Sequence, residues 1–218
     1  LELSSFQLDD MYDSRINIAV LTNITEDHLD RYDYNMQYYT NSKFRILQNQ
    51  QKDDAFIYCS DDEIIAAEVV KKKLPAKLFP FSIREKKEPG AYLENENINL
   101  TINNQTFTMS IHELALQGKH NIYNTMAAGI VGRLLDLRKE SIRESLSDFQ
   151  NVEHRLEKVS KIHGIEFIND SKATNINSAW YALESINTPI IWIMGCVDKG
   201  NNYEMVMDLV RKKVKAIV

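Results

Sequence analysis

The polar loop at residues 169–175 carries the side chains best suited to chemistry in this sequence. It reads Asn-Asp-Ser-Lys-Ala-Thr-Asn and lies between a short apolar stretch and a segment with helical spacing. Asp170 can accept hydrogen bonds from ribose hydroxyls, while Lys172 and Thr174 can hold an anion against the N-terminus of the following helix. A plain turn between a strand and a helix rarely contains all of these side chains, so the loop predicts a nucleotide or anion site.

A second loop, at residues 195–200, offers another lysine after another apolar stretch. Lys199 stands there inside a G-x-x-x-x-G pattern. A Walker phosphate loop would continue with Lys and then Ser or Thr, but Asn201 and Asn202 follow here. The loop is therefore not a Walker motif, and Lys199 is a candidate for an anionic substrate.

Two segments near the N-terminus contain possible ligands for a cation. Glu2 is followed by two serine hydroxyls, and a carboxylate beside hydroxyls at a strand end suits a hard cation such as Mg²⁺. His28 stands near Asp27 and Asp30 after an apolar strand, so it could ligate a metal or orient a phosphate at the sheet edge. A surface glutamate near a turn and a solvated, capped loop are the alternatives, and both stay open.

Lys43 occupies an unusual position for a charged residue. It shares one predicted helix face with Met36, Tyr39 and Ile46. Partial removal from water lowers the pKa of a lysine and frees the neutral amine, which can take up CO₂ to form an anionic carbamate that binds cations. The alternative is a lysine that follows the apolar surface with its methylenes and reaches water with its ammonium group.

Further polar residues could contact a nucleotide. Asn121 and Asn124 are three residues apart at the start of a predicted helix, so they share a face and could read a purine edge or hold a phosphate. Capping of the helix would explain one asparagine but not two. Arg155, at a predicted domain boundary, could reach a nucleotide phosphate when the domains close, and an ion pair between domains is the alternative.

The elements that must position these residues follow from hydrophobic periodicity and turn residues. Strands are predicted at residues 16–21, 55–59, 78–83, 91–94, 98–102 and 106–111, and helices at 34–47, 62–72, 119–137 and 139–149. Beyond a boundary at residues 150–154, strands at 165–168 and 190–194 alternate with helices at 175–186 and 203–213. This alternation predicts a parallel sheet.

Composition excludes several classes of protein. The chain has 218 residues, 44% of them apolar and 26% charged, with a net charge of −5 and no basic block. This argues for a globular protein that does not bind nucleic acid, and no apolar run is long enough to span a membrane. Cys59 and Cys196 match no metal spacing, so we expect a reduced, cytoplasmic protein. The chain starts at Leu1 and stops in what looks like a strand, which we interpret as two cuts in a longer protein.

With these residues in view, the chain resembles the Mur ligase family, and within it the members that add D-glutamate. Seven stretches carry the resemblance in the family's order: ELSSFQL from Glu2, NITEDHLDRY from Asn23, SKFRI around Lys43, GKHNIYNTMAA from Gly118, EHRLE from Glu153, FINDSKATN from Phe167 and the glycine-lysine loop from Gly195. The first and sixth stretches distinguish the D-glutamate-adding members from relatives that add other amino acids.

The resemblance implies an α/β fold and a division of labour along the chain. Residues 1–151 would form most of a central ATP- and Mg²⁺-binding domain, a mixed sheet with helices, without its upstream phosphate loop. Residues 152–218 would begin a Rossmann-like, amino-acid-binding C-terminal domain that is truncated here.

The resemblance also assigns roles to single residues. Glu2, His28 and carbamylated Lys43 would bind Mg²⁺, and Asn121, Asn124, Arg155 and Asp170 would bind ATP. Lys172, Thr174 and Lys199 would face D-glutamate or the acyl-phosphate, and Lys43, His28 and Lys172 would take part in catalysis. Cys196 stands where a second glycine is more usual in the family.

The implied reaction is ATP-dependent ligation of D-glutamate to UDP-N-acetylmuramoyl-L-alanine through an acyl-phosphate, in peptidoglycan precursor synthesis. Because the phosphate loop, the domain for the UDP moiety and the end of the C-terminal domain are missing, we expect no ligase activity from these 218 residues alone. We further expect a monomer. The alternatives are another amide ligase of the superfamily, similar to folylpolyglutamate synthase, and a nucleotide-binding module without catalysis.

Overall fold

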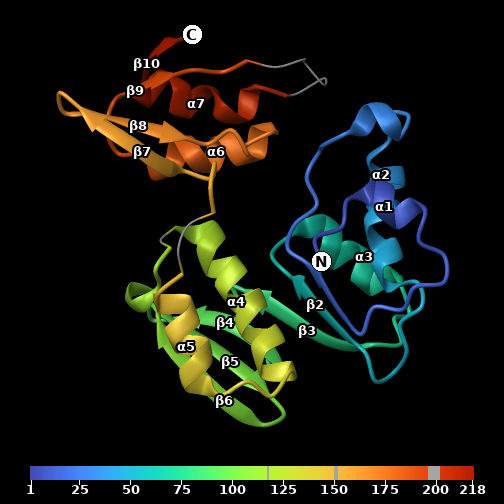
Figure 1. The fold of residues 1–218 in the computed structure, drawn as a ribbon. Coiled ribbons are helices and arrows are strands. Elements are labelled where there is room, and N and C mark those ends of the chain that lie inside the picture. Colours follow the sequence, from blue (N-terminus) through green and yellow to red (C-terminus); the bar gives the residue numbers. More distant parts are fainter. Residues whose placement is uncertain (117, 150–151, 196–201) are drawn as a thin grey trace. The chain divides into compact units, whose positions relative to one another are not determined.

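The computed structural model describes residues 1–116, 118–149, 152–195 and 202–218 of the chain. It divides into two compact units, which are described separately. Unit 1 comprises Leu1–Ile24 and Tyr32–Phe149, and unit 2 comprises Thr25–Arg31 and Gln150–Val218 (Figure 1). None of the described helices is both long and apolar enough to cross a membrane.

Unit 1 is built on a mixed sheet whose strands lie side by side in chain order. Its strands are β1 (Ile18–Leu21), β2 (Ala55–Cys59), β3 (Lys77–Ser82), β4 (Gly90–Glu94), β5 (Asn97–Ile102) and β6 (Gln105–Ser110). The first four pair in parallel, and β4, β5 and β6 pair antiparallel. The parallel strands β1, β2 and β3 therefore end at one edge of the sheet, where ligand sites are common in α/β folds.

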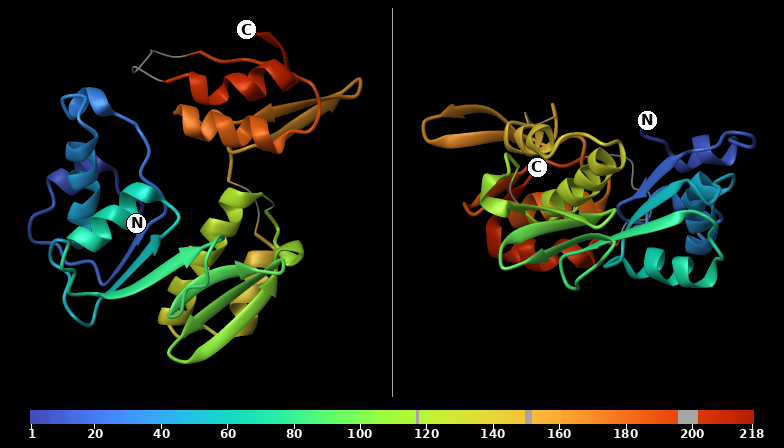
Figure 2. Two further views of the ribbon diagram at one scale, coloured as in Figure 1. Left: turned by 180° about the vertical axis from the view of Figure 1, so that it is seen from behind. Right: turned by 90° about the horizontal axis from the view of Figure 1, so that it is seen from below.

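The helices of unit 1 contact this sheet or pack on one another. They are α1 (Ser5–Asp9), α2 (Met36–Phe44), α3 (Glu63–Lys71), α4 (Lys119–Leu134) and α5 (Lys139–Ser147), with 3-10 turns η2 (Arg45–Leu47) and η3 (Ile111–Glu113). Helices α3 and α4 contact the sheet directly, whereas α1 and α5 pack on another helix. Helix α4 crosses β2 to β5 and carries α5 beside it, as the two views of Figure 2 show. Buried Ile122, Met126 and Ile130 form the apolar stripe of α4, at the spacing expected of one helix face.

The sequence explains the strand types. Four of the five β2 residues are buried, as expected for a parallel strand covered on both faces, whereas β5 alternates buried and half-buried residues. Asp62 caps α3, since its carboxylate accepts a hydrogen bond from the Ile65 amide at 2.9 Å. Asn103 and Asn104 adopt φ values of 50° and 60° in the tight turn between β5 and β6.

The described residues of unit 2 form two small sheets and two α-helices. Strands β7 (Glu157–Ile162) and β8 (Ile165–Asn169) form an antiparallel hairpin, while β9 (Ile190–Trp192) and β10 (Val214–Ile217) pair in parallel. Helices α6 (Ile176–Ser185) and α7 (Glu204–Lys213) pack together, and η1 (Leu29–Arg31) belongs to the first segment. The Lys213 ammonium group, at the end of α7, donates hydrogen bonds to three carbonyl oxygens at the end of α6, at 2.7–2.8 Å.

Three sequence expectations need correction. The predicted parallel sheet of unit 2 is correct for β9 and β10 but wrong for β8, which pairs with β7. Strand β7 was not predicted because charged residues interrupt its alternation, and its side chains are mostly exposed. The segment after Glu2 was treated as a strand end, but it forms the short helix α1 because Ser4 and Gln7 make a capping box.

Candidate functional site

Two aspartates, Asp61 and Asp62, follow the carboxyl end of β2 and connect it to the neighbouring ends of β1 and β3. Asp61 follows β2 and accepts hydrogen bonds from the Tyr123 hydroxyl at 2.8 Å, the Ser82 hydroxyl at 2.6 Å and the Ile83 amide at 2.8 Å. Asp62 also accepts from the Ile24 amide at 2.9 Å, so it holds the segment that follows β1. Through these hydrogen bonds the two carboxylates connect the segments that follow β1, β2 and β3.

Helix α4 brings the two predicted asparagines to this edge. It begins after Gly118, whose φ of 102° favours glycine, and no side chain caps its first turn. Asn121 is half-buried and Asn124 is exposed, and both lie in the first two turns of the helix. Two amide side chains beside backbone N–H groups can bind a purine edge or phosphate oxygens.

Lys43 lies on α2, as the periodicity predicted. It is half-buried, and its Nζ lies 5.5 Å from the centroid of the buried Tyr39 ring, one turn earlier. Its neighbours hold α2 against α1: the Ser42 hydroxyl donates to the Ser5 carbonyl at 3.0 Å, and the Arg45 guanidinium donates to the Leu8 carbonyl at 2.7 Å. The Lys43 helix is therefore fixed to the helix that follows Glu2.

Glu2 itself is exposed and precedes α1. Of the two hydroxyls beside it, that of Ser4 is used in the helix cap and Ser5 is buried, so the predicted grouping of carboxylate and hydroxyls is not seen. Across the described ranges, no cluster of three or more His, Cys, Asp and Glu side chains is placed to hold a metal ion. The proposed set of Glu2, His28 and carbamylated Lys43 includes a modified lysine and remains a prediction.

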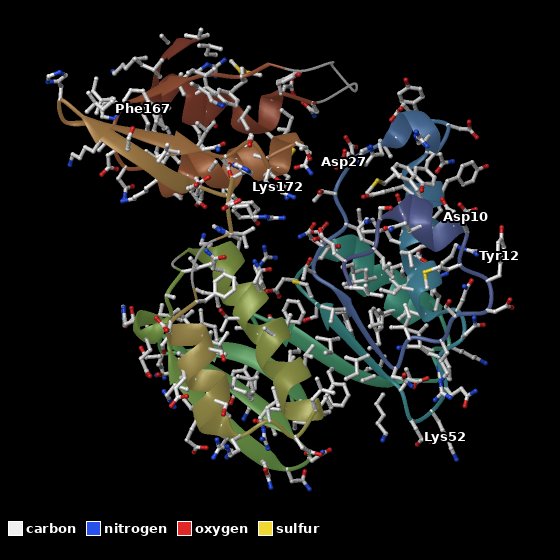
Figure 3. The ribbon with its side chains drawn as sticks, viewed as in Figure 1. Asp10, Tyr12, Asp27, Lys52, Phe167 and Lys172 are labelled. Atoms are coloured by element: carbon white, nitrogen blue, oxygen red, sulfur yellow. The ribbon has the colours of Figure 1, made fainter. Side chains whose placement is uncertain are left out.

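In unit 2, the structure brings two predicted clusters together. The Leu156 amide donates to the Asp170 carboxylate at 3.0 Å, and the Lys172 amide donates to the His154 carbonyl at 3.1 Å. Arg155 therefore lies beside the loop that carries Asp170 and Lys172, although it is 15 residues or more distant in sequence. Arg155 and Lys172 are both exposed, and Figure 3 labels Lys172.

The same loop also meets the segment that contains His28. Asn175 caps α6 by accepting from the Ser178 amide at 2.9 Å, and its side-chain amide donates to the Asp27 carboxylate at 3.3 Å. His28 has a φ of 53°, and its Nε2 lies 3.6 Å from the same aspartate. Thr174, next to Asn175, is exposed. Polar side chains thus gather around the N-terminus of α6.

Two residues of unit 2 were missed by sequence reasoning. The Asn169 side-chain amide lies 2.8 Å from His154 Nδ1, which fixes the ring beside the Asp170 loop. In the sequence, only the position of His154 next to Arg155 could have indicated a role for this histidine.

The remaining candidates are Lys199 and the two cysteines. Lys199 and Cys196 lie outside the described residues. Cys59 is buried, and burial raises the pKa of its thiol to about 11.

Comparison with known proteins identifies the family of this chain. The sequence model of the Mur ligase middle domain matches residues 1–132. The chain belongs to the Mur ligase family. Over all 218 residues it is 57% identical to the UDP-N-acetylmuramoylalanine–D-glutamate ligase of Christiangramia forsetii, and it covers 49% of that protein. The chain thus spans about half the length of the curated relatives it matches.

Solved structures of the Mur ligase family share the fold. MurF from Acinetobacter baumannii has a TM-score of 0.71 at 18% identity, over 92% of this chain and 50% of that one. MurF ligase from Thermotoga maritima, crystallised with ADP, has a TM-score of 0.63 at 14% identity, over 94% of this chain and 53% of that one. The expected α/β fold, a mixed sheet with helices, is confirmed.

Proposed function

We propose that the protein containing this chain joins D-glutamate to UDP-N-acetylmuramoyl-L-alanine at the expense of ATP. The observation that carries the proposal is the 57% identity, over every residue of the chain, to a relative named for this activity. The loop at residues 169–175 supports it, because this loop belongs to the stretches that distinguish D-glutamate-adding members of the family.

Nucleotide binding is assigned to residues of both units. Asn121 and Asn124 on α4 would bind the nucleotide, and Arg155 and Asp170 of unit 2 would contact its phosphates and ribose. The hydrogen bonds between the Asp170 loop and the turn at residues 154–156 support a joint role for the last two residues. A guanidinium group suits phosphate because it can donate two parallel hydrogen bonds.

The metal assignment rests on donor chemistry. The Glu2 carboxylate and a carbamate on Lys43 would supply the anionic oxygens that Mg²⁺ prefers, with His28 as a further ligand. When bound, Mg²⁺ would offset charge on the transferring phosphoryl group. Lys43 is half-buried beside the buried Tyr39 ring, and this position, partly removed from water, supports its choice among the lysines of the chain.

The reaction would proceed in two steps. The L-alanine carboxylate of the precursor attacks the γ-phosphorus of ATP, giving an acyl-phosphate and ADP. The amine of D-glutamate then attacks the acyl carbon, and inorganic phosphate leaves from the tetrahedral intermediate. Lys172, Thr174 and Lys199 would hold the D-glutamate carboxylates or the acyl-phosphate, where fixed cations stabilise developing negative charge.

ADP release by the protein at the length of its relatives tests the proposal. We expect turnover that needs ATP, UDP-N-acetylmuramoyl-L-alanine and D-glutamate together, and none when L-glutamate or L-lysine replaces D-glutamate. The 218-residue chain is the matched control, and we expect it to be inactive. Ligation of glutamate to a folate substrate, or ATP binding without any turnover, would contradict the proposal. The expected cytoplasmic location and monomeric state stay predictions, which cell fractionation and size-exclusion chromatography would test.

A further inference from the structure

Tyr123 links the start of α4 to the edge of the sheet. It lies between Asn121 and Asn124, and its hydroxyl donates a hydrogen bond to the Asp61 carboxylate at 2.8 Å. Its ring packs against Phe81 of β3, with 6.1 Å between the ring centroids. The side chain is therefore held both by packing and by a polar contact to a charged group.

Asp61 also accepts two hydrogen bonds from the end of β3. The Ser82 hydroxyl and the Ile83 amide donate to it at 2.6 Å and 2.8 Å, and Ser82 is fully buried. Hydrogen bonds to an ionised carboxylate are short and stronger than those between neutral groups. One carboxylate thus joins the end of β2, the end of β3 and the start of α4. Burial and the Asp61 carboxylate raise the pKa of Tyr123, so its hydroxyl keeps its proton and remains a donor at neutral pH.

Helix geometry relates this contact to the asparagines. Successive residues of an α-helix are rotated by about 100° around its axis, so Asn121 and Asn124 lie close to one face. Tyr123 projects away from that face and toward the sheet. Buried Ile122 and Met126 hold the helix on the sheet. The hydrogen bond of the Tyr123 hydroxyl adds a directional contact in its first turns, which adjusts the direction in which the two amides point.

We propose that Tyr123 is a positioning residue: its hydrogen bond to Asp61 sets the orientation of Asn121 and Asn124 toward the nucleotide. This inference rests on the proposed function, because it takes the two asparagines to be nucleotide ligands. In this proposal Tyr123 acts through the two asparagines and not on the reacting atoms. Its loss should therefore weaken nucleotide binding and leave the chemical step nearly unchanged.

The test is Tyr123→Phe in the protein at the length of its relatives, with Tyr92→Phe as the matched control. Tyr92 is a buried tyrosine of the same unit, and its hydroxyl reaches the Glu88 carboxylate only at 3.5 Å. For Tyr123→Phe we expect the KM for ATP to rise by about threefold to tenfold, the size that loss of one hydrogen bond gives, with kcat within about twofold of wild type. Tyr92→Phe should leave both constants unchanged.

A second variant keeps the inference falsifiable if Tyr123→Phe is poorly folded. Asp61→Asn removes the charge at constant size and should raise the KM for ATP in the same direction. The double variant should bind ATP no more weakly than Asp61→Asn alone, because both changes break one contact. Additive effects, an unchanged KM, or a lowered melting temperature with unchanged KM would overturn the inference.

Direct binding of ATP separates this inference from the proposed function. If the wild-type protein binds ATP but does not ligate, the proposed function fails, and calorimetric Kd values of the variants still test Tyr123. If wild type ligates and Tyr123→Phe has the same KM for ATP, the inference alone fails. If wild type does not bind ATP at all, both fail.

Discussion

Unit 1 and unit 2 differ in how each is stabilised internally. Unit 1 has a continuous core in which large side chains such as Ile57, Phe81 and Met126 are fully buried. Within the described part of unit 2, the buried apolar residues are only Leu183 and Val206. Many of its apolar side chains are exposed instead, among them Ile165 at 60%, Ile193 at 78% and Phe167, labelled in Figure 3, at 48%.

The difference shows that two kinds of interaction hold the candidate site residues in place. Asn121 and Asn124 lie on a helix that a large core fixes in place. Arg155, Asp170 and Lys172 lie on loops of unit 2 that hydrogen bonds order, and individual hydrogen bonds contribute only about 1 kcal/mol each. We therefore expect unit 2 to unfold under milder conditions than unit 1. Trp180 and Trp192, the two tryptophans of the chain, are both in unit 2, so their fluorescence follows that unit alone.

The largest expected contrast concerns two glycines with positive φ. Gly90, at the start of β4, has a φ of 140°, and a Cβ atom there would collide with the carbonyl oxygen of Pro80. Gly90→Ala should cost about 2–5 kcal/mol, since overpacking and an unfavourable backbone conformation add. Urea denaturation followed by far-UV circular dichroism would measure this.

The matched control is Gly164→Ala in the β7–β8 turn. Gly164 has a φ of 84°, but no atom lies within 4 Å of the added Cβ. Only the backbone penalty of about 1–2 kcal/mol applies, and tryptophan fluorescence should report it. Equal costs at the two glycines would mean that the packing of β4 against β3 is looser than described.

The next contrast concerns pH and ion pairs. In unit 1, hydrogen bonds from the Arg15 guanidinium, at 2.8 Å and 3.0 Å, and from the Gln51 amide lower the pKa of Asp54 to about 2. Because this folded-state pKa lies below the ordinary value of 3.8, the contribution of Asp54 is complete above pH 4 and is lost as the pH falls toward 2. The urea midpoint of wild type should approach that of Asp54→Asn across this range.

Unit 2 offers a control for this pH effect. Glu166 faces Lys158 and Lys161 at 3.8 Å and 3.9 Å, and all three side chains are exposed. Such surface pairs contribute between 0 and about 1 kcal/mol, so Glu166→Gln should hardly change the denaturation curve at any pH. If the urea midpoint of Asp54→Asn fell at acid pH as much as that of wild type, the Arg15–Asp54 pair would not contribute to the pH dependence of stability.

The same contrast explains what the sequence could predict. In unit 1, strand and helix positions followed from periodicity, because burial on one or two faces imposes a pattern: β2 was predicted at its observed limits, and α4 from its stripe of Ile122, Met126 and Ile130. In unit 2, β7 left no such pattern, since an exposed strand has no face that must be apolar. Its pairing with β8 could not be predicted for the same reason.

Site residues could be predicted where several polar residues lie close together in the sequence. They could not be predicted where a residue acts through a partner that is distant in the sequence. The loop at residues 169–175 and the helical position of Lys43 were found from a few neighbouring residues. Asp61 and Tyr123 are 62 residues apart, and their contact exists only because α4 crosses the end of β2. A tyrosine in a helix and an aspartate after a strand are each ordinary, so neither indicates the other in the sequence.

The smallest expected contrast tests core against surface directly. Ile130 of α4 is fully buried, and Ile165 of β8 is 60% exposed. Ile130→Val removes one methylene group from a packed environment and should cost about 0.5–1.5 kcal/mol. Ile165→Val removes the same group from a site that is mostly in water, so the change should be close to zero. Urea midpoints by circular dichroism for the first and by tryptophan fluorescence for the second would measure both. A cost at Ile165 equal to that at Ile130 would mean that the exposed face of the hairpin is covered in solution.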